Sequence, residues 1–226
     1  MIILGVDSTS KSASTAVLKD GVILSENYIN NGLTHSQTLM PLIEKSLNDA
    51  SVSVKDIDYI AVTNGPGSFT GIRIGIANVK GLAFTNNIKC CPVSTLEALS
   101  VNAKHFTGKI YTVLDARCNQ IYFAEFESDS KGINRVCDDT AISLDELKEK
   151  VRCEKRKIIF VGDGAKLCFD YLDNEFSNVI LSEANQRFTK ASSVCLCFDE
   201  DKTVTPEKLA IEYLRLPQAQ RNLKKE

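Results

Sequence analysis

The sequence has few residues suited to a metal centre and no excess of positive charge. It contains two histidines, His35 and His105, which are too few for a histidine-rich metal site. None of the eight cysteines stands in a C-x-x-C pair, the spacing of zinc knuckles and redox sites. A net charge of −2 argues against a protein that binds nucleic acid alone, because phosphate contacts need clustered lysine and arginine. This net charge is compatible with a protein whose partner binds the nucleic acid.

The sequence also has no apolar run long enough to span a membrane, and Met1–Asp7 lacks the basic start and the length of a signal peptide. We therefore predict a cytoplasmic protein with no membrane contact. A disulfide framework is not expected there, so the cysteines are interpreted as small buried apolar residues. The 226 residues have the composition of a globular protein and are long enough for two small domains.

The most distinctive segment is Thr63–Gly75, which follows the apolar run Ile57–Val62. Its Gly-Pro-Gly sequence ends a strand, and Ser68 or Thr70 is predicted to cap the helix that follows. Glycines at 71 and 75 leave that helix nearly bare, at a cost of about 1 kcal/mol each. A helix of this kind is explained either by phosphate binding at its N-terminus or by close packing against another backbone. We favour packing, in a tight helix–helix contact.

The order of apolar runs predicts an internal duplication. An apolar strand ending on aspartate, a polar turn and a second strand occur at residues 2–18 and again at 110–126. We therefore predict an N-terminal lobe, 1–106, and a C-terminal lobe, 107–205. A helix over 206–216 is expected to pack back on the first lobe. Strands are predicted at 2–6, 14–18, 22–29, 59–63, 88–93, 110–115, 120–126, 157–161 and 179–181, and other helices at 34–48, 72–84, 94–104, 144–151, 165–172 and 192–198.

Five segments together resemble the TsaB (YeaZ) family: Gly5–Ser10, His35–Pro41, Asn64–Gly75, Val161–Ala165 and Tyr213–Arg215. The resemblance implies an α/β fold, the duplicated, RNase H-like fold of actin, Hsp70 and sugar kinases, with two small domains whose mixed sheets are flanked by helices. It also implies a role in making threonylcarbamoyladenosine in tRNA. In that machinery TsaD transfers the threonylcarbamoyl group to adenosine 37, TsaB binds TsaD, and the ATPase TsaE joins them. Contact with tRNA would come only through the complex.

The resemblance implies no catalytic metal in this chain. The paralogue TsaD carries a His-x-x-x-His pair on the helix after the strand that follows the glycine loop. Thr95 and Leu99 stand at the matching positions here, and neither can replace a metal-binding histidine. The family has also been labelled a glycoprotease. Peptidase activity has little support, because no base–nucleophile pair is evident.

Two aspartates are the candidates for nucleotide chemistry. The resemblance places at Asp7 a carboxylate that positions nucleotide-bound magnesium, with Asp115 as its counterpart. Neither is followed by the glycine that lets phosphate approach, so a turn or cap role is favoured for Asp7. ATP or ADP is expected only at a composite site shared with partners. The alternative function is a stand-alone small ATPase or phosphotransferase that uses both aspartates.

The remaining candidate function is a protein interface on the helices 34–48 and 70–84. An apolar stripe and a small-residue face are predicted to bind TsaD or, in its absence, a second copy of the chain. Gly75→Leu is predicted to disrupt this pairing more than folding, and Arg73 is expected to have a counter-charge because it opposes the helix dipole. The predicted interface residues are His35, Leu39, Leu42, Ile43, Leu47, Phe69, Thr70, Gly71, Ile72, Arg73, Gly75 and Ile76.

Overall fold

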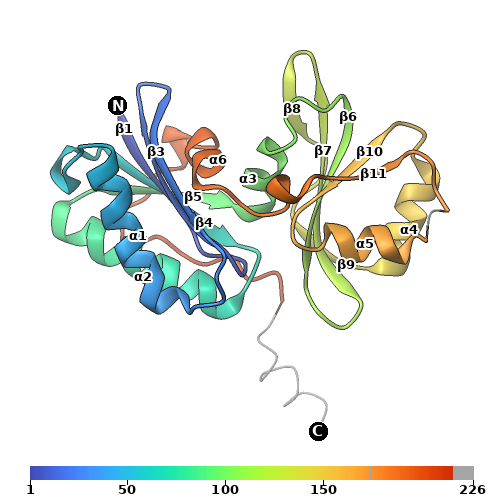
Figure 1. Cartoon of the computed structure of the whole chain (residues 1–226), viewed down its shortest axis with the longest axis horizontal. Helices are drawn as coiled ribbons and strands as arrows, with labels where there is room; N and C mark the ends of the chain where they lie inside the picture. The colour runs from blue at the N-terminus through green and yellow to red at the C-terminus, as the bar shows by residue number, and fades with distance from the viewer. Residues whose placement is uncertain (174, 216–226) are drawn as a thin grey trace, which may run out of the picture.

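The chain forms two α/β lobes connected by a short helix, α3 (Thr95–Val101) (Figure 1). The computed structural model describes residues 1–173 and 175–215. The strands are β1 (Ile2–Asp7), β2 (Ala13–Lys19), β3 (Val22–Ile29), β4 (Tyr59–Gly65), β5 (Lys89–Ser94), β6 (Gly108–Asp115), β7 (Gln120–Asp129), β8 (Gly132–Arg135), β9 (Thr140–Ser143), β10 (Ile158–Val161) and β11 (Val179–Leu181). The other helices are α1 (His35–Asp49), α2 (Phe69–Asn86), α4 (Leu144–Cys153), α5 (Ala165–Tyr171) and α6 (Ala191–Leu196).

The two sheets have the same topology. The first runs β3-β2-β1-β4-β5 and the second runs β8-β7-β6-β10-β11, with β9 added beside β7. β1 is antiparallel to β2 and parallel to β4, and β6 is antiparallel to β7 and parallel to β10. This repeat of order and direction confirms the predicted duplication. The fold class is the predicted α/β class, in which each lobe has a mixed sheet flanked by helices.

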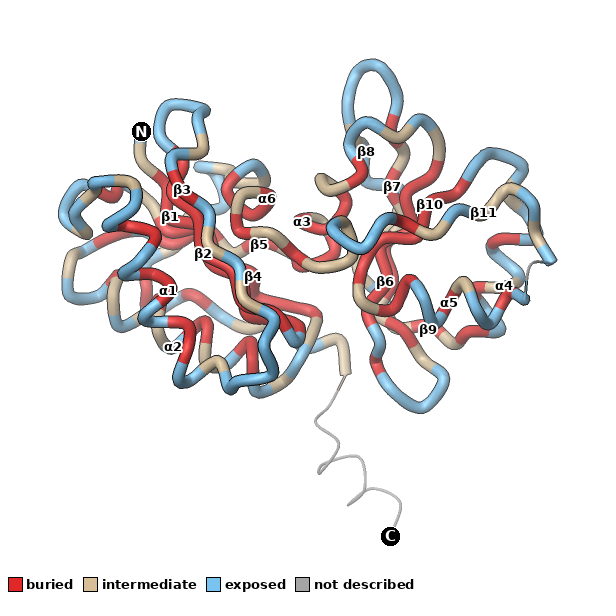
Figure 2. Tube along the Cα trace, in the orientation of Figure 1, coloured by how far each residue is buried: buried red, intermediate tan, exposed pale blue. Residues whose placement is uncertain are grey.

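Continuous apolar runs form the central strands because helices cover both faces of each sheet. In Figure 2 the buried stretches, in red, follow β1, β4, β6 and β10. In the first lobe α1 and α2 cover one face of the sheet, and α6 covers the other. In the second lobe α4 and α5 lie on one side of the sheet, and α3 packs against the other.

Helix α3 is shared between the lobes. Its Ala98 packs in the apolar cluster of the first sheet and α6, whereas Leu96 and Leu99 pack with residues of β6 and β7. The helix therefore lies between the two sheets, as its central place in Figure 1 shows. Among the described residues, no helix is long and apolar enough to cross a membrane.

The predicted helix over 206–216 is wrong for its described part, 206–215. Thr205 and Pro206 begin a single turn, and residues 209–215 then form neither helix nor strand, with a bend at 214 and 215. Contacts with the first lobe replace helical hydrogen bonds, since Glu212 N donates to the carbonyl of Asn64 at 2.9 Å. Residue 216 lies outside the described residues. Two strands, β8 and β9, were not predicted.

The division into lobes 1–106 and 107–205 stays a prediction. Residues 189–205, which fall within the range predicted for the C-terminal lobe, lie with the first lobe. Helix α6 packs against β1 and β2, and Val204 forms an antiparallel bridge with Cys90 of β5. The chain thus crosses from the first lobe to the second and returns.

Candidate functional site

Residues Thr63–Gly75, named here the glycine segment, pack against the turn between β1 and β2 of their own lobe. Ser68 is the N-cap of α2, and its Oγ accepts a hydrogen bond from Gly71 N at 3.2 Å. A Cβ at Gly71 would overlap the carbonyl oxygen of Ser8, and one at Gly75 would overlap Ser8 Oγ. Ser8 Oγ donates to the carbonyl of Gly71 at 2.9 Å. The expected close backbone contact exists, but the strand turn makes it and not a second helix.

Asp7 is enclosed by its own lobe. Its side chain has no exposed surface, and its Oδ1 accepts hydrogen bonds from the hydroxyls of Thr9 at 2.6 Å and Thr63 at 2.8 Å. Burial raises the pKa of this carboxyl above its ordinary value. Asp7 Oδ2 is also buried and has no hydrogen-bond partner among the described residues. The carboxyl therefore accepts hydrogen bonds within the turn after β1, and its role toward a nucleotide stays a prediction.

Asp115 is paired with a residue that the sequence analysis did not single out, Asp163. Asp115 N donates to Asp163 Oδ1 at 3.1 Å, and Asp115 Oδ1 accepts from Arg117 N at 2.8 Å. Burial, with Asp115 beside it, raises the pKa of Asp163 from 3.8 to about 6. No hydrogen bond joins Asp7 with Asp115 within the described residues. A Gly-Asp-Gly turn after an apolar strand was the signal that could have identified Asp163.

The two positions that match the paralogue's metal-binding histidines hold buried side chains. Thr95 and Leu99 on α3 are both fully buried, and Leu99 packs with Ile110 and Phe126 of the second sheet. No group of three histidine, cysteine, aspartate or glutamate side chains that could hold a metal occurs in the described residues. Leu99 contributes apolar packing, and Thr95 has a buried hydroxyl with no hydrogen-bond partner among the described residues. Neither side chain is of a type that replaces a metal-binding histidine.

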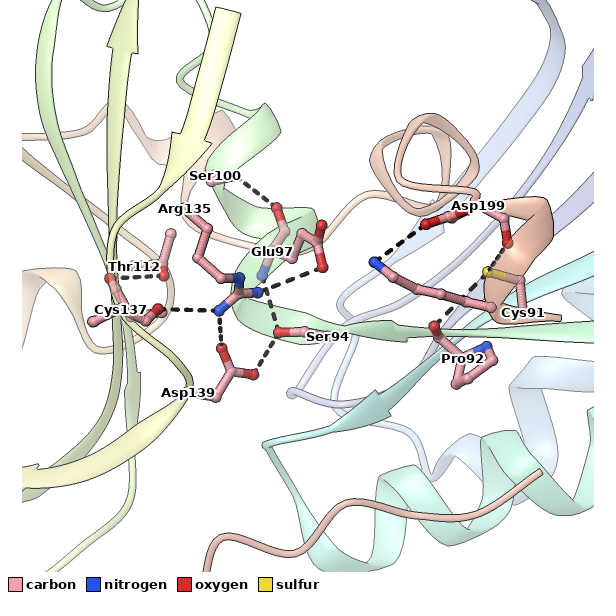
Figure 3. A network of polar contacts seen from close by, with 12 residues as sticks. Cys91, Pro92, Ser94, Glu97, Ser100, Thr112, Arg135, Cys137, Asp139 and Asp199 are labelled. Atoms are coloured by element: carbon pink, nitrogen blue, oxygen red, sulfur yellow. Dashed lines mark hydrogen bonds and ion pairs between the residues drawn. The ribbon is translucent and has the colours of Figure 1, made fainter. Parts of the chain in front are cut away.

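An ion-pair cluster around Arg135 lies beside α3 and joins this helix to the second lobe (Figure 3). Arg135, at the end of β8, donates through Nη1 to Asp139 Oδ1 at 2.6 Å, and its Nη2 lies 3.5 Å from Glu97 Oε2. Ser94 Oγ, the N-cap of α3, contacts Asp139 Oδ2 and accepts from Glu97 N at 3.1 Å. The guanidinium also lies 4.7 Å from the ring centre of Phe126. Sequence patterns gave no sign of this cluster.

The structure divides the predicted interface residues by exposure. Eight are buried in the first lobe: Leu39, Leu42, Ile43, Leu47, Gly71, Ile72, Gly75 and Ile76. His35 and Phe69 are half-buried, and Thr70 and Arg73 are exposed. The buried eight cover the chain's own sheet, so they could serve a partner only by positioning the exposed residues. Binding at this face stays a prediction.

The same helices expose large apolar residues that the prediction omitted. Met40 of α1 is 42% exposed and Phe84 of α2 is 67% exposed. Both are large apolar residues that fall outside the buried stripe of their helix. An apolar residue on the polar side of a helix was the sequence signal that could have identified them.

Residues 204–215, named here the C-terminal strap, run along the first lobe beside the glycine segment. Leu209 is buried in the apolar core that α1 and α2 form with the first sheet, and Asn64 Nδ2 donates to the carbonyl of Ala210 at 3.3 Å. At the end of the strap, Arg215 Nη1 donates to the carbonyl of Ala116 in the second lobe at 2.7 Å. The strap therefore contacts both lobes.

Known proteins resemble this chain along nearly its whole length. The TsaB protein of Bacillus subtilis, named for tRNA threonylcarbamoyladenosine biosynthesis, is 28% identical over 221 residues, covering 97% of this chain and 96% of that protein. Its Escherichia coli namesake is 30% identical over 222 residues, covering 95% of each chain. This chain belongs to the TsaB family.

Two further comparisons agree with membership of the TsaB family. The family model TsaD, described as tRNA N6-adenosine threonylcarbamoyltransferase, matches residues 25–222, as expected for a paralogue. The solved structure of YeaZ from Pseudomonas aeruginosa has a TM-score of 0.81 at 23% identity and covers 94% of this chain and 99% of its own. That similarity shows a shared fold. The TsaB family places this chain in tRNA threonylcarbamoyladenosine biosynthesis.

Proposed function

We propose that this chain is a non-catalytic, structural and activating subunit that binds TsaD. With TsaE, the complex forms N6-threonylcarbamoyladenosine at adenosine 37 of tRNA. The observation that carries the proposal is the buried packing of Thr95 and Leu99 at the positions implied for metal histidines. Family membership supports the pathway, and the packed helix α3 supports a role without catalytic metal in this subunit.

The partner surface in this proposal is the exposed side of α1 and α2. Thr70 and Arg73 lie on it, together with Met40 and Phe84, whose exposed apolar surface is of the kind that a protein partner covers. TsaD would bind this surface, and a second copy of the chain would bind it when TsaD is absent. The nucleic acid contact belongs to the complex, and so does any ATP or ADP site. The cytoplasm remains the predicted location.

The enclosure of Asp7 counts against the alternative, a stand-alone ATPase or phosphotransferase. Positioning nucleotide-bound magnesium requires a carboxylate that water and phosphate can reach, whereas Asp7 is fully buried with one oxygen bound by two hydroxyls. A peptidase also lacks support, because the hydroxyls beside Asp7, those of Thr9 and Thr63, are buried where no peptide substrate can reach them.

The decisive experiment is reconstituted tRNA modification with TsaD, TsaE and the adenylate-forming enzyme, with and without this chain. The variant is Asp7→Asn combined with Asp115→Asn, since asparagine keeps the oxygen that accepts the hydrogen bonds of each turn. We expect modification to require the chain and the double variant to support it within about twofold of the wild-type rate. The readout is modified adenosine per tRNA, measured by mass spectrometry.

The control measures folding and pairing of the double variant by circular dichroism and by binding to TsaD. A folded, TsaD-binding double variant that no longer supports modification would show that the aspartates contribute chemistry. Turnover of ATP by the purified wild-type chain, lost in the double variant, would favour the stand-alone ATPase. Modification that proceeds at full rate without the chain would refute an activating role.

A further inference from the structure

An exposed arginine on α2 lies over one aromatic ring and beside a second ring from a distant part of the chain. The guanidinium carbon of Arg73 lies 3.7 Å from the ring centre of Phe69 and 5.9 Å from that of Tyr213. Arg73 Nε donates to Tyr213 Oη at 2.9 Å, and the two ring centres are 4.9 Å apart. These contacts fix the guanidinium plane before any partner arrives.

The charge of Arg73 is not matched by a carboxylate in residues 1–173 and 175–215. Four other arginines form ion pairs with acidic side chains: Arg117, Arg135, Arg152 and Arg156. Neither Nη atom of Arg73 donates to a described group. The residue also lies in the N-terminal part of α2, where the helix dipole favours a negative charge and opposes a positive one. An anion at this place would therefore be stabilised by both the guanidinium and the helix.

The C-terminal strap supplies the second ring and fixes its position. Glu212 N donates to the carbonyl of Asn64, immediately before Tyr213, and a Cβ at Gly65 would overlap the carbonyl oxygen of Glu212. The absence of a side chain at Gly65 thus allows the backbone of the strap to pack directly against the glycine segment. Tyr213 remains 43% exposed, so the cluster is open to a partner.

We propose that Phe69, Arg73 and Tyr213, named here the arginine anchor, bind an aspartate or glutamate carboxylate on the protein partner. Arg73 would use its two Nη atoms as a planar pair of donors, the geometry that carboxylates accept. Phe69 and Tyr213 would pack around the contact, since tyrosine and arginine dominate the binding energy of protein interfaces. The inference rests on the proposed function in taking TsaD as the partner.

The surrounding charge favours a protein carboxylate over a nucleic acid phosphate. Glu212 precedes Tyr213 and is exposed, so this neighbour of the anchor adds a negative charge and not the second cation that a phosphate chain would need. Arg215 is already bound to the carbonyl of Ala116, and Lys80 Nζ lies 3.4 Å from the carbonyl of Glu207. Nucleic acid binding requires several available cations, whereas one carboxylate requires a single oriented guanidinium.

The test measures the affinity of the full chain for TsaD by isothermal titration calorimetry. Arg73→Lys keeps the charge but loses the planar pair of donors, and Tyr213→Phe keeps the ring but loses the hydroxyl that orients Nε. We expect about tenfold weaker binding for Arg73→Lys and about threefold for Tyr213→Phe, whereas the matched control Arg152→Lys in the second lobe leaves affinity unchanged. Melting temperature is recorded for each variant.

Charge exchange identifies the group that is bound. Arg73→Glu should abolish binding, and one aspartate- or glutamate-to-arginine change on TsaD should restore it. Unchanged affinity of both anchor variants would overturn the anchor and leave the proposed function standing, whereas no affinity of the wild-type chain for TsaD would refute the proposed function itself. A lower melting temperature without weaker binding would assign Arg73 to strap attachment only. Loss of tRNA affinity by the assembled complex, with TsaD binding intact, would assign it to phosphate.

Discussion

At the scale of single residues, the protonation of Asp163 makes the stability of the chain depend on pH. Burial beside Asp115 raises its pKa from 3.8 to about 6, with Lys11 and Arg117 as the nearby cations. A folded-state pKa above the unfolded value means that the folded protein holds the proton more tightly. The contribution of Asp163 to stability is therefore complete below about pH 4 and is lost as the pH rises to about 6.

Asp163→Asn should remove this pH dependence. Asparagine resembles the protonated acid and keeps the Oδ1 that accepts from Asp115 N. We expect the variant to be more stable than wild type by on the order of 1–2 kcal/mol at pH 8 and equally stable near pH 4. Urea unfolding at pH 4, 6 and 8 provides the measurement. Asp138→Asn, at an exposed position of the second lobe, is the control, and a gain that is the same at every pH would contradict the assignment.

At the scale of elements, α2 has three glycines whose surroundings differ. A Cβ at Gly71 would overlap the backbone of Ser8, one at Gly75 would overlap a side-chain oxygen that can move, and one at Gly81 would meet nothing within 4 Å. Because these contacts are within one chain, Gly75→Leu is now expected to disturb folding first. The close fit explains Gly71 and Gly75 without reference to a partner.

Alanine substitutions along α2 should therefore change stability in a fixed order. We expect Gly71→Ala to destabilise the chain by about 2–3 kcal/mol through forced backbone movement, and Gly75→Ala to cost less. Gly81→Ala should stabilise it by about 0.5–1 kcal/mol, because alanine is the better helix former and has free space there. Chemical unfolding of the three variants gives the order. Equal effects at Gly71 and Gly81 would show that helix propensity alone decides.

The same elements show what the sequence could predict. Apolar runs such as Ile2–Asp7 identified the central strands, and the repeat of strand, aspartate and turn identified the duplication. Periodicity found the apolar stripe of α1, but it cannot say whether a partner or the chain's own sheet covers it. Local capping residues predicted a C-terminal helix where hydrogen bonds to Asn64 hold the non-helical C-terminal strap. The Arg135 cluster joins residues that only the folded chain brings together.

At the scale of the whole molecule, side chains on α3 and beside it hold the two lobes in one arrangement. Asn102, just after α3, donates through Nδ2 to the carbonyls of Gln186 and Phe188 on the returning segment at 3.0 and 2.9 Å. Its Oδ1 accepts from Ser193 Oγ at 2.9 Å. Arg135 joins the second sheet to the first turn of α3. A fixed arrangement of the lobes agrees with the proposed role as a structural subunit, because a partner bound to one lobe then also has a fixed position relative to the other.

These contacts should make the lobes unfold as one unit. Asn102→Ala leaves two carbonyls without a donor, at about 1–3 kcal/mol each, and Arg135→Met leaves Glu97 and Asp139 facing each other without a cation. We expect one calorimetric transition for wild type and two separated transitions for the double variant, since each lobe keeps its own core. Arg156→Met, which removes ion pairs within the second lobe only, is the control and should shift the transition without splitting it. A single transition in the double variant would mean that the apolar contacts of Leu96 and Leu99 suffice to couple the lobes.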